Sequence, residues 1–188
     1  MQLLRNSGSR EVKSQFYNSS ALSFLLCRMI EIVLLVNFVA TAVMMGVIWF
    51  VQWVHYPLLA TVSVDRAIET AVDHQRRTGQ VLALPMAVEG VTTLWLLVSR
   101  PDAVSLILPW LAAVLLAVAL GSTVFISVPL HAKMAMNPSA DVGRRLVVTN
   151  WPRTIAWSAR VVVCAAMLLP SESLTVSWLV KVGGKQDG

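Results

Sequence analysis

Long apolar stretches alternate with short polar connections along the chain, and two of the stretches contain no charged residue. Residues 32–64, between Glu31 and Asp65, lack Asp, Glu, Lys and Arg, and so do residues 103–132, between Asp102 and Lys133. A helix crosses the ~30 Å hydrocarbon core of a bilayer in about 20 residues. Each run therefore predicts one membrane-spanning helix, at 30–53 and at 104–127.

Two further apolar stretches are each interrupted by one charge. Glu89 is the charged residue of 79–99, and Arg160 is the charged residue of 154–171. They predict two more spans, at 79–99 and 152–170. Short connections between successive spans favour antiparallel neighbours. The predicted fold is therefore all-α: residues 29–172 form a four-helix transmembrane bundle with up-down-up-down topology.

The first long connection has a helical pattern of its own. Between 63 and 78, apolar residues recur at helical spacing opposite charged ones, which predicts a short amphipathic helix that Gly79 separates from the second span. Its face with Ala67, Ala71 and His74 either packs on the end of the bundle or lies flat on the bilayer. A second short helix is expected at 141–148.

The two ends of the chain differ from the apolar middle. Residues 1–28 are rich in Ser and Asn and carry four basic residues, so we expect a flexible basic tail, or a start that precedes the native one at Met29. Residues 173–188 form a C-terminal tail. Lys and Arg divide evenly between the two sides of the predicted bundle, which leaves its orientation in the membrane undecided.

Composition places the chain in a membrane. Hydrophobic residues make up 56% of it and charged residues 13%, whereas a soluble domain carries about 25% charged residues. The net charge of +5 is spread between the apolar runs rather than along one stripe, which argues against a nucleic-acid partner. Cys27 and Cys164 have neither metal-binding nor disulfide spacing.

Antiparallel connectivity brings the three histidines to the same end of the bundle. His55 ends the first span, His74 precedes the second, and His131 follows the third. Imidazole nitrogens suit zinc, copper or iron, so a metal ion or haem is one candidate ligand of this end. The alternative is three interfacial side chains that bond to backbone or water beside the tryptophans.

Each predicted span carries one polar stripe, and intramembrane polar groups usually face the bundle interior. Glu89 and Arg160 lie at similar depths on neighbouring spans, so we expect an ion pair, with Trp157 stacked on the guanidinium of Arg160 or Arg153. Small residues on the spans, among them Gly46, Gly90 and Gly121, are expected to allow close helix packing. The stripes contain Thr41, Met45, Gln52 and His55; Pro85, Glu89, Thr92 and Thr93; Thr123, Ser127 and His131; and Arg153, Trp157, Arg160 and Cys164, with Asn150 beside the last.

Four segments taken together carry a resemblance: His55-Tyr56-Pro57, residues 73–77 (Asp-His-Gln-Arg-Arg), Pro129-Leu130-His131 and residues 150–154 (Asn-Trp-Pro-Arg-Thr). Over about residues 30–170, the chain resembles a family of small uncharacterised bacterial four-helix integral membrane proteins. More distantly it is similar to the anthrone oxygenase-like membrane proteins, some of which are linked to oxidation of polycyclic aromatic phenols. His131 stands where those proteins are expected to have asparagine. The resemblance implies a bacterial inner-membrane location.

Two functions follow from these patterns. The first is an accessory or structural membrane subunit with an interior polar seam and a histidine-lined pocket at one end. The second is a binding or redox module, or an oxidoreductase, that holds a metal, haem, quinone or lipophilic aromatic ligand at that pocket. His55, His74 and His131 are the candidate ligands, and the buried residues expected to support them are Gln52, Glu89, Asn150, Arg153, Trp157 and Arg160. The expected partners are the lipid bilayer and other membrane subunits or a second copy.

Overall fold

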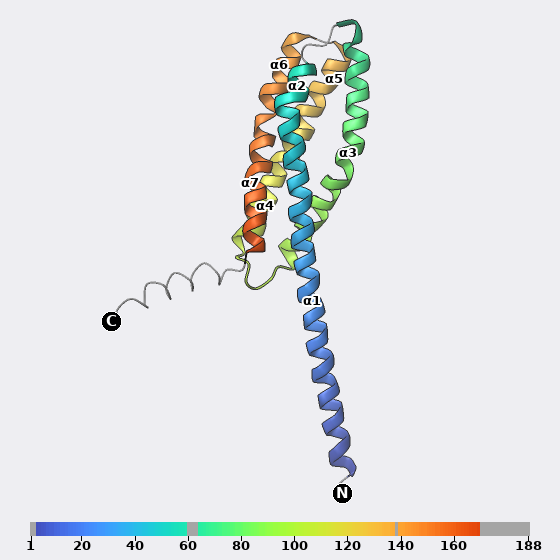
Figure 1. Cartoon of the computed structure of the whole chain (residues 1–188), viewed down its shortest axis with the longest axis vertical. Helices are drawn as coiled ribbons and strands as arrows, with labels where there is room; N and C mark the ends of the chain where they lie inside the picture. Colours follow the sequence, from blue (N-terminus) through green and yellow to red (C-terminus); the bar gives the residue numbers. More distant parts are fainter. Residues whose placement is uncertain (1–2, 60–63, 138, 170–188) are drawn as a thin grey trace, which may run out of the picture.

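A computed structural model describes residues 3–59, 64–137 and 139–169 of the chain; the side chains of 3–21, 23, 24, 59, 64–67 and 71 lie outside the description. The described residues are helical, with no strand among them (Figure 1). The elements are α1 (Leu3–Phe50), the π-helical segment η1 (Val51–His55), α2 (Tyr56–Leu59), α3 (Val64–Val98), α4 (Ile107–Ser122), the π-helical segment η2 (Thr123–Ser127), α5 (Val128–Met136), α6 (Ala140–Thr149) and α7 (Trp151–Leu168).

Four long helical rods run antiparallel and form the predicted bundle. In Figure 1, α1 with η1 and α2 rises, α3 descends, α4 with η2 and α5 rises, and α7 descends. α1 packs between α3 and α7, and α4 packs against α7 and α3. Three of the rods are long and apolar enough to cross a membrane: Leu25–Leu58, Ile68–Val98 and Ile107–Met136. The chain is thus a helical membrane protein, and α7 completes its bundle.

The first helix differs from the expectation at its N-terminal end. Residues 1–28 were expected to form a flexible tail, but α1 is one continuous helix from Leu3 to Phe50. No proline precedes Pro57, and Gly8 is the only glycine before Gly46, so nothing in this stretch breaks a helix. The predicted tail at 173–188 lies outside the described residues.

The second span and the helix before it form one rod. α3 runs from Val64 to Val98 without the expected break at Gly79, whose φ is negative. A glycine inside a helix costs only about 1 kcal/mol relative to alanine, which its neighbours can offset. Pro85 lies inside the same helix, and α3 bends along its length in Figure 1. Ser63 and the side chains of Ala67 and Ala71 lie outside the described residues.

Two π-helical segments interrupt the rods near the histidine end. η1 contains Gln52 and His55, and η2 contains Thr123 and Ser127. A π turn inserts an extra residue into a helix and so shifts the faces of the residues around it, and such turns are frequent at functional sites. The sequence pattern did not indicate either segment.

The second predicted short helix is confirmed as α6, which lies at the histidine end. Ser139 caps it by accepting a hydrogen bond from the backbone N–H of Val142 at 3.3 Å. Leu146 and Gly143 are its buried residues, and α6 contacts α2 and α5. The helix therefore covers the ends of two rods of the bundle.

The predicted polar stripes face the bundle interior. Glu89, Thr92 and Thr93 on α3, and Ser127 and His131 on η2 and α5, are buried. Arg153, Trp157, Arg160 and Cys164 are all buried along one face of α7. Apolar side chains such as Val91, Leu94 and Val162 are exposed on the outer surface, where lipid would contact them.

Candidate functional site

An ion pair lies inside the bundle, as the sequence predicted. Nε of Arg160 is 2.8 Å from Oε1 of Glu89, and both side chains have no exposed surface. Trp157 does not stack on a guanidinium as expected; its indole N–H donates to Oε2 of Glu89 at 3.1 Å. Both carboxylate oxygens of Glu89 are therefore occupied by donors from α7.

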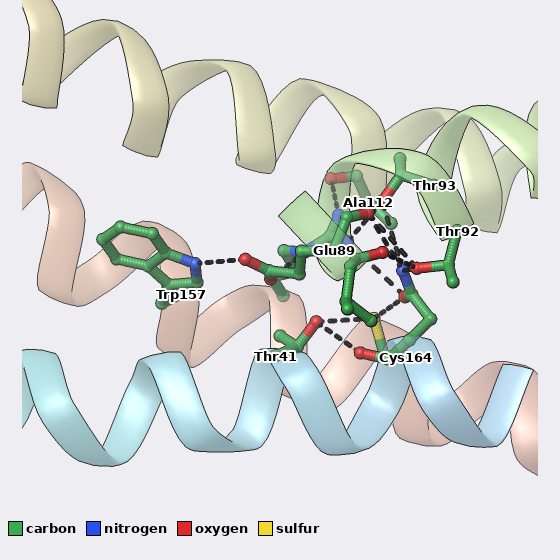
Figure 2. Close-up of polar contacts among 10 residues, drawn as sticks. Thr41, Glu89, Thr92, Thr93, Ala112, Trp157 and Cys164 are labelled. Atoms are coloured by element: carbon green, nitrogen blue, oxygen red, sulfur yellow. Dashed lines mark hydrogen bonds and ion pairs between the residues drawn. The ribbon is translucent and has the colours of Figure 1, made fainter. Parts of the chain in front are cut away.

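The remaining hydrogen bonds of Arg160 tie three other helices to α7. Its guanidinium donates to the carbonyl oxygen of Ala112 on α4, to the hydroxyl of Thr93 at 2.6 Å and to Oδ1 of Asn37 at 3.4 Å. The amide of Asn37 in turn donates to the hydroxyl of Thr92 at 2.7 Å. Figure 2 shows these contacts converging from α1, α3, α4 and α7.

This buried cluster, hereafter the central lock, has a partner for every charge. Thr41 and Cys164 complete it, since the thiol donates to Oδ1 of Asn37 at 3.2 Å and the Thr41 hydroxyl donates to the backbone oxygen of Asn37. Charges inside a bilayer are stable only when they are paired and hydrogen-bonded. The central lock meets that condition with groups of the chain itself, and its hydrogen bonds join all four rods.

The three histidines meet at the other polar cluster, at the end of the bundle. The rings of His55 and His74 are stacked, with centroids 4.1 Å apart and planes 25° apart. The rings of His74 and His131 follow at 5.1 Å. η1, α3 and α5 thus each supply one imidazole, as antiparallel connectivity predicted.

The histidines do not have the geometry of a metal site. A nitrogen ligand points its lone pair outward in the plane of its ring, so stacked rings direct their lone pairs side by side rather than at one ion. Nδ1 of His74 is also paired with the Thr78 hydroxyl at 3.0 Å. Among the described residues, no group of three His, Cys, Asp or Glu side chains could hold a metal ion.

A chain of hydrogen bonds runs inward from His131. Nε2 of His131 lies 2.9 Å from the hydroxyl of Tyr56, and that hydroxyl accepts a hydrogen bond from Arg153 at 2.9 Å. Arg153 also donates to Oδ1 of Asn150, at 2.9 Å from Nε. The amide of Asn150 donates to Oε1 of Gln52 at 2.8 Å. The predicted supporting residues Gln52, Asn150 and Arg153 are therefore hydrogen-bonded to one another, and Tyr56 connects Arg153 to His131.

A cavity of about 210 Å³ lies beside this chain. Its polar lining is concentrated at the histidine end, where His74, His131, Tyr56 and Arg153 contribute. Trp157, which also contacts the central lock, lines the same cavity. The apolar part of its wall is formed mainly by Met44, Val47, Ile48, Val51, Leu82, Ala83, Met86 and Val128.

A second, polar hollow lies on the outer side of His74. His55, Glu69, Asp73 and Arg77 line it, and His74 and Thr78 line both spaces. Asp73 is held there by Arg76 and Arg77, each at 2.6 Å. His74 thus stands between the outer polar hollow and the inner apolar cavity.

Some buried polar atoms near the cavity have no partner. Among the described residues these are Nδ1 of His131, Nε2 of His55 and the hydroxyl oxygen of Ser122. A buried polar group without a hydrogen bond costs about 1–3 kcal/mol, so such atoms indicate a place where a further molecule can bind. Of these three residues, His131 is also among those that line the cavity.

Two residues of these clusters were missed at the sequence level. Asn37 is one of the two amide side chains in the charge-free run 32–64, the other being Gln52, and an amide inside a predicted span is itself a signal of an interior position. Tyr56 gave no such signal, because a tyrosine at the end of a span is usual at a membrane interface. No family model, curated protein or solved structure matches the chain.

Proposed function

We propose that this protein is a membrane-embedded binding module for a small lipophilic molecule, which occupies the cavity between α1, α3, α5 and α7. One observation carries the proposal: the cavity has apolar walls and a cluster of polar groups at one end. Sites for small molecules have this composition, since apolar walls supply affinity and a few polar groups fix orientation.

The volume limits the ligand to a small one. Cavities for drug-sized ligands range over about 300–1,000 Å³, and this cavity holds about 210 Å³. A quinone ring, a small aromatic molecule or a short alkyl chain fits, whereas a macrocycle such as haem does not. Entry from the bilayer between α3 and α5 is supported by four lining residues that are exposed: Gln75, Gly79, Ala83 and Val128.

A pair of matched variants on α1 tests the proposal. Val47 lines the cavity, and Val43 lies one turn before it and is 48% exposed on the outer surface. Val47→Phe should fill the cavity, and Val43→Phe should add the same side chain outside it. Binding of labelled octanamide, a neutral molecule with an apolar chain, is measured in zwitterionic nanodiscs against empty nanodiscs.

Saturable binding at one site is expected in the wild type and in Val43→Phe, with at least a tenfold loss in Val47→Phe. The proposal is contradicted if binding is unchanged in Val47→Phe, or if the wild type shows saturable binding of neither octanamide nor its carboxylate analogue octanoate. A redox role for the module, and its place in a bacterial inner membrane, remain part of the same proposal. They are supported by the resemblance described above.

An accessory or structural subunit is the second candidate, and the central lock favours it. A network with all its charges paired stabilises a bundle without any ligand. Mild-detergent purification from a native membrane tests this role. A stoichiometric partner subunit that is retained in Val47→Phe would favour the second candidate over the first.

A further inference from the structure

The polar end of the cavity contains a buried positive charge for which the described part of the chain offers no balancing negative one. Arg153 is 7% exposed. Its hydrogen-bond partners are the neutral groups Asn150, Tyr56 and Thr123. Among the described residues, no carboxylate lies within ion-pair distance of its guanidinium; the ion pairs there involve Arg28, Arg76, Arg77, Arg144, Arg145 and Arg160.

A comparison within the same helix shows how unusual this is. Arg160 lies two turns further along α7 and faces the carboxylate of Glu89 at 2.8 Å. Removing the partner of a buried charge destabilises a protein by about 3–5 kcal/mol, because the remaining charge is neither solvated nor paired. In the described part of the chain, Arg153 is such an unpaired buried charge. An anion in the adjoining cavity would pair with it and remove this cost.

The groups around Arg153 suit an anion rather than a cation. Nη1 of Arg153 has only a long contact, 3.4 Å, to the Thr123 hydroxyl, so it retains donor capacity. Since the Tyr56 hydroxyl accepts from Arg153, its own hydrogen can go to Nε2 of His131. The tautomer that accepts at Nε2 carries its hydrogen on Nδ1, and that atom is buried without a partner.

The acidic groups that line the outer hollow or belong to the central lock do not compete for this position. Asp73 and Glu69 line the outer hollow beyond His74, and Asp73 is already held by Arg76 and Arg77. Glu89 is engaged by Arg160 and Trp157. The cavity end therefore has the guanidinium of Arg153, and none of these carboxylates is bound to it.

We infer that the ligand of the cavity is a lipophilic acid whose ionised carboxylate binds Arg153, with its apolar body along Met44, Ile48 and Met86. This inference rests on the proposed function and names the chemical class of its ligand. Guanidinium and carboxylate form charge-assisted hydrogen bonds that are stronger than neutral ones. The binding step moves no electrons and breaks no covalent bond.

Octanoate and octanamide test the inference, because they have the same chain and differ in the charge of the head group. Binding of each is measured in zwitterionic nanodiscs with wild type, Arg153→Gln, Arg153→Lys and Arg144→Gln. Arg144 is an exposed arginine of α6 at the same end of the bundle, so its variant matches the change in net charge. Partitioning into lipid is the same for all four proteins and cancels in their ratios.

Wild type and Arg144→Gln should prefer octanoate by about 10- to 100-fold, as expected for hydrogen bonds to a charged group. Arg153→Gln should lose the preference, and Arg153→Lys should keep part of it. Equal binding of both probes to the wild type overturns the inference and leaves the proposed function intact. If neither probe saturates, the proposed function fails as well. Should Arg153→Gln not fold, the wild-type preference and the Arg153→Lys variant still decide the question.

Discussion

Two arginines of one helix face have different roles because their surroundings differ in one carboxylate. Arg160 has Glu89 and is part of the central lock, whereas Arg153 has neutral partners and lines the cavity. Both are buried, so residue type and burial alone do not separate a structural arginine from a binding one. The two kinds of arginine are distinguished by whether a carboxylate lies within hydrogen-bond distance of the guanidinium.

The central lock gives a prediction at the residue scale. Glu89→Gln and Arg160→Gln should each lower the free energy of unfolding by about 3–5 kcal/mol, because each leaves an unpaired buried charge. The double variant should be less destabilised than either single variant, because no buried charge remains. Unfolding in detergent, followed by circular dichroism, measures the three differences.

The exposed ion pair between Asp141 and Arg145 on α6 is the control. These side chains are 60% and 66% exposed, and their atoms are 3.0 Å apart. Asp141→Asn and Arg145→Gln should each change stability by less than about 1 kcal/mol, as is usual for surface pairs. If the Glu89 and Arg160 variants behave like this control pair, the central lock does not hold the bundle in register.

At the residue scale, the sequence predicts an ion pair where the depth of both residues along their helices can be counted from the helix ends. Glu89 and Arg160 enter the membrane from the same end and lie at similar distances along their helices, so their pairing followed from helix rise. The partners of Arg153 did not follow, because Tyr56 lies at a π turn that the sequence does not reveal. The extra residue in a π turn changes which side chains face the bundle interior. The spacing of hydrophobic residues along the sequence does not reveal where such a turn lies.

At the element scale, charge-free runs located the helices but not their ends. An apolar run shows which part of the chain excludes charged residues. A helix continues beyond that part when no helix-breaking residue follows. α3 extends through Gly79, and α1 extends back to Leu3. Gly46, Gly90 and Gly121 were expected to allow close helix packing, and this prediction was wrong, because a Cβ added at each meets no atom within 4 Å. Close packing therefore does not require glycine there.

Gly79 gives the prediction at this scale. Its position is open, since an added Cβ meets no atom within 4 Å, and it lies inside a continuous helix. Gly79→Ala should therefore raise the free energy of unfolding by about 0.5–1 kcal/mol through helix propensity. Gly79→Pro should lower it by about 3 kcal/mol or more, because a helix-interior proline removes a hydrogen bond and clashes.

Thermal unfolding in detergent, without added ligand, distinguishes these outcomes. Gly46→Ala on α1 is the matched control, since an added Cβ is equally free there. A Gly79→Pro variant as stable as the wild type would show that the chain does end a helix at this position, as the sequence pattern suggested.

At the scale of the whole molecule, α1 is far longer than the bundle requires. Its 48 residues span about 72 Å at 1.5 Å per residue, more than twice the ~30 Å hydrocarbon core. Among the α1 residues whose side chains the structure describes, those that belong to the apolar core begin at Val33 and Leu34. Figure 1 shows the preceding part of α1 projecting away from the other helices.

A chain that starts at Met29 should therefore keep its fold. Because the core residues of α1 are retained, we expect the free energy of unfolding to change by less than about 0.5 kcal/mol, the range of surface changes. Chemical denaturation of both chains in the same detergent measures the difference. A truncated chain that fails to fold would mean that the projecting part of α1 is needed to form the bundle.

The two ends of the bundle are unequal, and this asymmetry gives the last prediction. One end carries α2, α6 and the histidines, and the other has the connection between α3 and α4. Asp102 is exposed in that connection, and Arg144 is exposed on α6. If the bundle crosses a bilayer, a cysteine at 102 and a cysteine at 144 must lie on opposite sides of the membrane.

A Cys27→Ser background makes the measurement clean, because Cys27 is exposed and Cys164 is buried. Asp102→Cys and Arg144→Cys are then labelled with an impermeant maleimide in right-side-out and in inverted vesicles. Each variant should be labelled in one kind of vesicle, and the two variants in opposite kinds. Labelling of both from the same side would contradict the antiparallel transmembrane bundle. In that case the central lock would have to lie outside the hydrocarbon core. The cost of placing a charge in lipid would then no longer explain why Glu89 and Arg160 are paired.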